Sequence, residues 1–108
     1  MKRMKILLAT AALAVPFGVQ GQDVAAAEAL AKKSGCMKCH SVSAKKEGPS
    51  FKDTAAKYKG KPDAEKALTT FLTSNPKVKV DGKEEMHDAP KTSDQAQITN
   101  LVKYILSR

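Results

Sequence analysis

The chain has 108 residues, enough for one small domain, and carries 19 Lys and Arg residues against 11 Asp and Glu residues, a net charge of +8. Three of the basic residues, Lys2, Arg3 and Lys5, belong to a segment with the pattern of an export signal, and without them the net charge falls to +5. A net charge of this size on an exported chain gives no reason to expect nucleic acid as a partner.

The first segment has the three parts of a secretory signal. An uncharged run from Ile6 to Val19 follows the basic start, and small residues surround Gly21. The apolar run is about fourteen residues long, short of the roughly 20 that a membrane-spanning helix needs. Pro16 and Gly18 interrupt it. We expect residues 1–21 to be a cleaved signal and residues 22–108 to be one periplasmic domain of a bacterium, without stable membrane insertion; an uncleaved anchor is the alternative.

The first expected helix follows Asp23, a suitable N-cap, and consists of the alanine-rich run VAAAEALAKKSG, which ends at Gly35. Alanine is a strong helix former, and its small side chain lets another helix approach closely. A shorter helix is expected over residues 51–58 and stops at Gly60.

Two further helices have clear apolar stripes. One begins near Pro62-Asp63 and ends at Asn75-Pro76, and its stripe consists of Ala64, Ala67, Leu68, Phe71 and Leu72. The other is introduced by Thr92, with Gln95 three residues later in the form of a capping box. Its stripe runs to the end of the chain and consists of Ile98, Leu101, Val102, Ile105 and Leu106, with Tyr104 on an adjacent flank.

No segment has the pattern of a strand, so we expect an all-α fold of three to four helices. Two long polar segments, residues 41–50 and 74–91, connect the helices. Loops of this length in a compact domain are usually functional or disordered. The second loop contains Met86 and His87.

The only two cysteines of the chain lie in Cys36-Met37-Lys38-Cys39-His40. A disulfide across two intervening residues would close almost no loop and would stabilise little. A thioredoxin-like redox pair normally follows a strand in a βαβ unit, which this chain lacks. A zinc site needs four nitrogen or sulfur ligands, and beyond this motif only His87 remains.

Covalent haem attachment accounts for all three residue types of the C-x-x-C-H motif. On a turn that opens a helix, two thiols can reach the two vinyl groups of one porphyrin edge, and the next residue projects under the ring centre. We therefore expect Cys36 and Cys39 to carry one covalent haem c through thioethers, and His40 to bind its iron through Nε2.

Iron in an electron carrier usually has a second axial ligand, and Met or His would suit. Beyond the signal the chain has two methionines, and Met37 lies within the attachment loop on the His40 side. Met86 lies in the polar stretch DGKEEMHDAPK, where no apolar partner explains a buried methionine. We predict Met86 as the second axial ligand; His87 and a five-coordinate iron are the alternatives.

With these residues in place, the chain resembles the class I cytochromes c of the small bacterial periplasmic monohaem type. The resemblance covers residues 22–108 and rests on GCMKCH, GPSF at 48–51, the methionine in the second loop and the terminal helix DQAQITNLVKYILS. It implies a small cytochrome c fold in which the terminal helices cross beside one haem. It also implies that the Pro49 backbone carbonyl accepts a hydrogen bond from His40 Nδ1–H.

The chain departs from this family pattern at two places. Small members often have an aromatic residue in the N-terminal helix, where this chain offers alanines and Leu30 opposite Tyr104. Proline and tryptophan are common around the ligand methionine, whereas EEMHDAP has only Pro90, four residues after Met86.

The resemblance implies a monomeric one-electron carrier, not an enzyme, that exchanges electrons with redox proteins or membrane respiratory complexes. Apolar side chains of the stripes, Leu68, Phe71 and Ile98, are expected to shield the haem. Lysines near both loops could steer acidic partners: Lys38, Lys45, Lys46, Lys77, Lys79 and Lys83. The alternatives are a haem subunit bound tightly to an oxidoreductase complex and a ligand-binding haem sensor with an open iron site.

Overall fold

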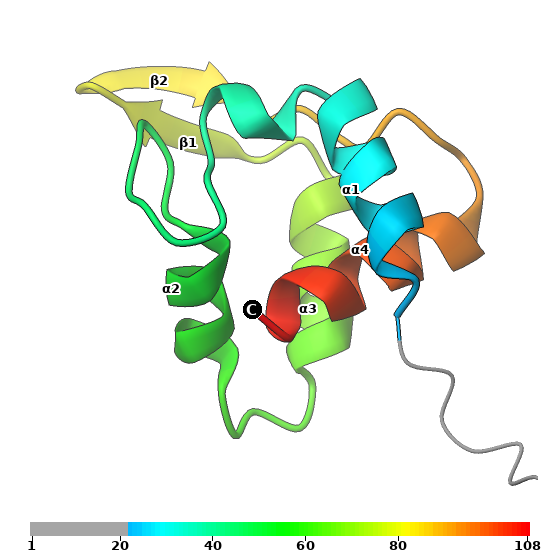
Figure 1. Ribbon diagram of the computed structural model, residues 1–108. Helices are drawn as coiled ribbons and strands as arrows, with labels where there is room; N and C mark the ends of the chain where they lie inside the picture. Colours follow the sequence, from blue (N-terminus) through cyan, green and yellow to red (C-terminus); the bar gives the residue numbers. More distant parts are fainter. Residues whose placement is uncertain (1–21) are drawn as a thin grey trace, which may run out of the picture.

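The computed structural model describes residues 22–108, and the predicted signal peptide, residues 1–21, lies outside the described residues. Four α-helices, a short 3₁₀ turn and a two-stranded hairpin follow one another along this part of the chain (Figure 1). They are α1 (Val24–Lys33), η1 (Cys36–Lys38), α2 (Phe51–Tyr58), α3 (Ala64–Thr73), β1 (Lys77–Val80), β2 (Lys83–Met86) and α4 (Gln95–Leu106). The predicted helical fold class is confirmed, whereas the expectation that no strand forms is wrong.

The hairpin occupies the middle of residues 74–91, the segment predicted to be an irregular loop. Its strands pair antiparallel, with Lys77 opposite Met86. Asp81 and Gly82 form the turn, and both have positive φ angles, 50° and 78°. Two consecutive left-handed residues are the conformation of a type I′ turn, for which Asp-Gly is a preferred sequence. This dipeptide after the alternating Lys-Val-Lys-Val of β1 is the sequence signal that predicts the hairpin.

Most of the predicted helix ends are confirmed. The carboxylate of Asp23 accepts a hydrogen bond from the N–H of Ala26 at 3.1 Å and so caps α1. Gly35 follows α1 with a left-handed φ of 76°, and Gly60 follows α2 with the same angle. α3 ends at Thr73, before Asn75 and Pro76.

The predicted capping box of α4 is wrong, because the cap is Asp94 and not Thr92. One carboxylate oxygen of Asp94 accepts hydrogen bonds from the backbone N–H groups of Ala96 and Gln97, at 2.8 and 3.3 Å. The Thr92 hydroxyl instead accepts from the N–H of Asp94 and donates to the Gln97 side chain. Asp94 is next to the first helical residue, so its carboxylate reaches the free N–H groups of the first turn directly.

The core lies where α1, α2 and α3 each pack against α4 (Figure 1). Ala27 and Ala31 of α1 are almost completely buried, and their small side chains let α4 approach closely. Tyr104 of α4 is the largest fully buried residue, and its ring meets Phe51 edge to face at 6.1 Å between centroids. The remaining core residues are Leu30, Leu68, Leu72, Ile98, Leu101, Val102 and Ile105. Within residues 22–108, none of the helices is both long and apolar enough to cross a membrane.

A pair of side chain to backbone hydrogen bonds joins the start of α1 to the middle of α4. The Asn100 Oδ1 atom accepts from the N–H of Asp23 at 2.7 Å, and the Asn100 Nδ2 atom donates to the carbonyl of Asp23 at 2.9 Å. These two bonds connect residues 77 positions apart in the sequence and tie the start of α1 to α4.

Replacement of Asn100 by Ala removes both bonds and is expected to lower the free energy of unfolding by about 1–2 kcal/mol, since each bond contributes about 1 kcal/mol. Denaturant unfolding of the purified protein measures the change. Gln95→Ala, at an exposed position of the same helix, is the matched control. Equal unfolding midpoints for the two variants would contradict this role of Asn100.

Candidate functional site

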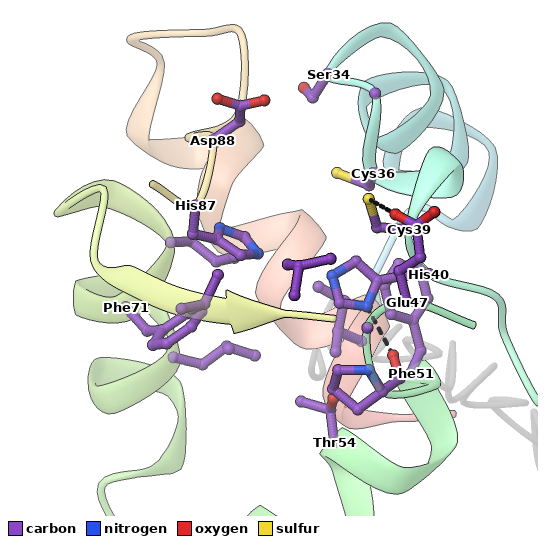
Figure 2. Close-up of a pocket in the computed structure, with 18 of the residues that line it drawn as sticks. Ser34, Cys36, Cys39, His40, Glu47, Phe51, Thr54, Phe71, His87 and Asp88 are labelled. Carbon is purple, nitrogen blue, oxygen red and sulfur yellow. Dashed lines mark hydrogen bonds between the residues drawn. The ribbon is translucent and has the colours of Figure 1, made fainter. Parts of the chain in front are cut away.

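A cavity of about 500 Å³ is lined by residues from η1, α2, α3, α4 and the hairpin. The C-x-x-C-H residues Cys36, Cys39 and His40 line one side of it (Figure 2). Its apolar lining consists of Phe51, Leu68, Phe71, Leu72, Val78, Val80, Leu101 and Ile105. The predicted shielding residues Leu68 and Phe71 are therefore in its walls, whereas Ile98 belongs to the core and Leu101 and Ile105 face the cavity from α4.

The two cysteines project into the same edge of the cavity because the chain between them forms a tight turn. Gly35, with its left-handed φ, turns the chain from α1 into η1. The carbonyl of Cys36 then accepts hydrogen bonds from the N–H groups of Cys39 and His40, at 3.2 and 3.0 Å. Both cysteines are free thiols, and Figure 2 shows their sulfur atoms close together. The sequence prediction that the motif gathers two thiols and an imidazole at one place is consistent with this turn.

The environment of the two thiols is unlike that of a redox-active pair. Burial raises the pKa of the Cys36 thiol. A hydrogen bond from Cys39 Sγ to the Glu47 carboxylate, at 3.3 Å, is the main cause that raises the pKa of the Cys39 thiol. Reactive cysteines of thiol–disulfide enzymes have a lowered pKa, because the thiolate is the nucleophile. Both side chains thus favour the thiol form, which does not support the thioredoxin-like alternative.

The His40 imidazole is held from two directions, by a backbone carbonyl and by an aromatic ring. Its Nδ1 atom lies 2.6 Å from the backbone carbonyl oxygen of Pro49. A carbonyl can only accept, so Nδ1 carries the proton and Nε2 keeps a free lone pair. The Phe51 ring stacks on the imidazole, with centroids 5.8 Å apart and an angle of 27° between the planes. This tautomer presents Nε2 as a metal ligand.

Gly48 is a site residue that the sequence analysis did not identify. A Cβ atom at this position would lie 2.5 Å from His40 Cε1 and 2.8 Å from His40 Nδ1, closer than real Cβ atoms come. Its N–H also donates to the carbonyl of Cys39 at 2.8 Å, so backbone and ring meet here at close range. The glycine in GPSF was a possible signal, because a close backbone approach to a side chain requires glycine.

Met86 and His87 take different positions relative to the cavity. Met86, the last residue of β2, touches the rim of the cavity but is 65% exposed. The His87 ring enters the cavity, where its centroid lies 6.0 Å from that of His40 and 5.1 Å from that of Phe71. Figure 2 shows the His40 and His87 imidazoles facing each other. The structure therefore brings His87, and not Met86, directly opposite His40.

The His87 ring has a buried nitrogen with no partner from the protein. Burial is the main cause that lowers the pKa of His87, so its neutral form is favoured. Its Nδ1 atom is the one buried side-chain nitrogen or oxygen in residues 22–108 that makes no hydrogen bond.

These residues fit a covalently attached haem. Two thiols share one edge of the cavity, His40 offers a free Nε2 lone pair, and the walls are largely apolar. The His87 imidazole, on the opposite side of the cavity from His40, supplies a further nitrogen donor. Soft sulfur and imidazole donors around an apolar space suit a haem better than a hydrated metal ion.

Comparison with known proteins gives consistent matches. A family profile described as cytochrome c matches residues 24–108. The chain is 36% identical to cytochrome c-551 of Pseudomonas aeruginosa over 102 residues, 94% of this chain and 91% of that protein. It is 57% identical to cytochrome c-552 of Hydrogenobacter thermophilus over 37 residues, 34% of this chain and 38% of that protein. Among solved structures, the class 1 cytochrome MtoD of Sideroxydans lithotrophicus ES-1 has a TM-score of 0.76 and 46% identity, covering 80% of this chain and 96% of that one.

Replacement of Gly48 by Ala is expected to displace the His40 ring and to destabilise the folded protein by about 1–3 kcal/mol, because the added methyl group has no space. Chemical shifts of the His40 ring protons measure the displacement. Gly60→Ala is the control: its added Cβ meets no atom, so it strains only its own left-handed backbone. Unchanged His40 shifts in Gly48→Ala would contradict the close contact.

Proposed function

The chain belongs to the cytochrome c family and carries one covalently attached haem c, and from this premise we propose that it shuttles single electrons between redox proteins in the bacterial periplasm. It is an electron carrier and not an enzyme. The observation that carries the proposal is the position of His40, whose free Nε2 faces an apolar cavity that has two thiols at its edge.

Cys36 and Cys39 are the attachment residues in this proposal, and each forms one thioether. Their position on one tight turn supports the assignment, because both sulfur atoms reach the same edge of the cavity. The Glu47 carboxylate accepts a hydrogen bond from the Cys39 thiol and would hold it at that edge for attachment.

His40 is the proximal iron ligand in this proposal, and the Pro49 carbonyl is its positioning group. The hydrogen bond to Pro49 keeps the proton on Nδ1 and orients the ring. Such a bond raises the basicity of the coordinating nitrogen. Gly48 and Phe51 restrict the ring on its other sides, so His40 needs little rearrangement to bind.

The sequence predicts Met86 as the distal ligand and leaves His87 as the alternative. The Met86 thioether is a soft donor and raises the reduction potential relative to a second imidazole. Met86 is at the rim of the cavity, so ligation requires its exposed side chain to turn inward.

When bound, haem c supplies the one-electron Fe(III)/Fe(II) couple. The chain's own contribution is the environment of that couple. The apolar side chains of α3, β1 and α4 exclude water from the cavity, and a low-polarity surrounding disfavours the more highly charged oxidised state. Two protein ligands would hold the iron in both oxidation states and would keep the reorganisation that accompanies electron transfer small.

Exposed lysines in the segments around the cavity are the basis of the proposed docking to acidic partners, because the cavity lining itself has more carboxylates than lysines. Lys79 lies at the cavity rim, and Lys38, Lys45, Lys46, Lys77 and Lys83 are exposed in the neighbouring segments. Glu47, Glu85 and Asp88 also line the cavity, so the surface is mixed and not uniformly basic. The proposed carrier works as a monomer and binds its partners transiently. These partners are redox proteins or membrane respiratory complexes with acidic docking surfaces.

The proposed function predicts that the exported protein has the mass of residues 22–108 plus one haem. It also predicts that a potentiometric titration follows a one-electron Nernst curve. Mass spectrometry of the intact protein and an optical redox titration make these measurements. Cys36→Ala with Cys39→Ala removes both attachment thiols and is expected to lose the covalent mass. A wild-type protein with the mass of its peptide alone would refute the proposal.

The proposed steering predicts that oxidation by the anionic hexacyanoferrate(III) ion slows several-fold as ionic strength rises. Lys79→Glu, at the cavity rim, is expected to reduce this rate several-fold at low salt. Lys66→Glu is the matched control, because it changes the net charge equally at an exposed site away from the cavity. Equal rates for the two variants would contradict local steering.

A further inference from the structure

We infer that His87 competes with Met86 for the distal iron position, and that the pairing of the hairpin β1–β2 favours His87. The inference rests on the proposed haem site, in which His40 is the proximal ligand. It concerns which of two adjacent side chains faces His40 when the hairpin is intact.

The register of the hairpin decides which side chains face the cavity. Cross-strand partners share one face of a two-stranded sheet, and successive residues alternate between the faces. Val78 and Val80 of β1 are half-buried and line the cavity, whereas the lysines that alternate with them are exposed. Val78 therefore marks the inner face, together with its partner Glu85.

Met86 lies on the outer face under the same rule. It pairs with Lys77, whose side chain is exposed, and Met86 itself is 65% exposed. His87 is the next residue, so it returns to the inner face that Val78 marks. The apolar pattern of β1 thus turns Met86 outward and His87 inward.

Two hydrogen bonds keep the backbone of His87 in this position. Its N–H donates to the carbonyl of Pro76 at 2.8 Å. Its own carbonyl accepts from Nδ2 of Asn75 at 3.2 Å. Both partners lie just after α3, so the end of this helix fixes where the His87 ring enters the cavity.

The ring itself has the placement of a metal ligand. A metal–imidazole bond is about 2 Å long, so two imidazoles on opposite sides of one ion would have centroids about 6 Å apart. The centroids of His40 and His87 are 6.0 Å apart, and the two rings face each other (Figure 2). Phe71 packs against the His87 ring edge to face and holds it on the cavity side.

Met86 and His87 cannot both ligate in one conformation, because neighbours in an extended chain point to opposite faces. Binding through Met86 requires the Lys77–Met86 pair to open or the strand to shift by one residue. A shift would also break the bond from His87 N–H to Pro76. The structure therefore favours His87, while the soft thioether of Met86 remains the competing donor.

The test uses the haem-loaded full chain and compares His87→Ala with Met86→Ala, each variant serving as the control for the other. Electron paramagnetic resonance, the optical spectrum of the ferric protein and the reduction potential report the ligand set directly. We expect a low-spin signal of two imidazoles as the main species in the wild type and in Met86→Ala. His87→Ala is expected to lose this signal, to gain the weak sulfur-to-iron charge-transfer band and to shift to a higher potential.

A third variant separates the backbone anchor from the ligand. Asn75 has a left-handed φ of 48°, so Asn75→Gly keeps the backbone conformation and removes only the bond to the His87 carbonyl. It is expected to raise the share of the sulfur-to-iron band. The inference is overturned if the sulfur-to-iron band of the wild type has the intensity of full methionine ligation and His87→Ala changes neither the spectrum nor the reduction potential. A wild type without covalent haem would refute the proposed function instead.

Discussion

The hydrogen bond between His40 Nδ1 and the Pro49 carbonyl is the constraint on which the rest of the site depends. It fixes the tautomer of the imidazole, and so it decides which nitrogen faces the cavity. The surrounding segment is built around this ring: Gly48 leaves room for it, and Phe51 stacks on it from the start of α2. Phe51 in turn meets Tyr104 in the core, so the position of His40 is tied to the packing of the terminal helices.

Local sequence patterns predicted much of the fold. The apolar stripes placed α3 and α4, and Asp23 and Gly35 gave the ends of α1, because periodicity and caps depend on residues a few positions apart. The hairpin was missed since its sequence is mostly charged and its strands are short. The Asp81-Gly82 dipeptide carried the signal, because Asp-Gly is a preferred sequence of the type I′ hairpin turn.

One part of the candidate site could likewise be predicted from local sequence, and the other part could not. Cys36, Cys39 and His40 are adjacent in sequence, so a single turn brings them together and the motif alone predicts their arrangement. The distal side depends on tertiary structure. Whether Met86 or His87 faces His40 follows from the register of β2 against β1 and from the hydrogen bonds that tie His87 to Asn75 and Pro76. The soft thioether of Met86 favours it as a ligand, whereas the alternation of side chains along β2 points His87 and not Met86 into the cavity. Without the register of the two strands, the sequence cannot decide between the two residues.

The central claim is that His40 presents Nε2 to iron with its Nδ1 proton donated to Pro49. Nitrogen-15 and proton NMR of the reduced, haem-loaded protein tests it most directly, because the two ring nitrogens give separate signals. The account predicts a slowly exchanging proton on His40 Nδ1 and none on Nε2. A proton on His40 Nε2, with Nδ1 bare, would contradict it.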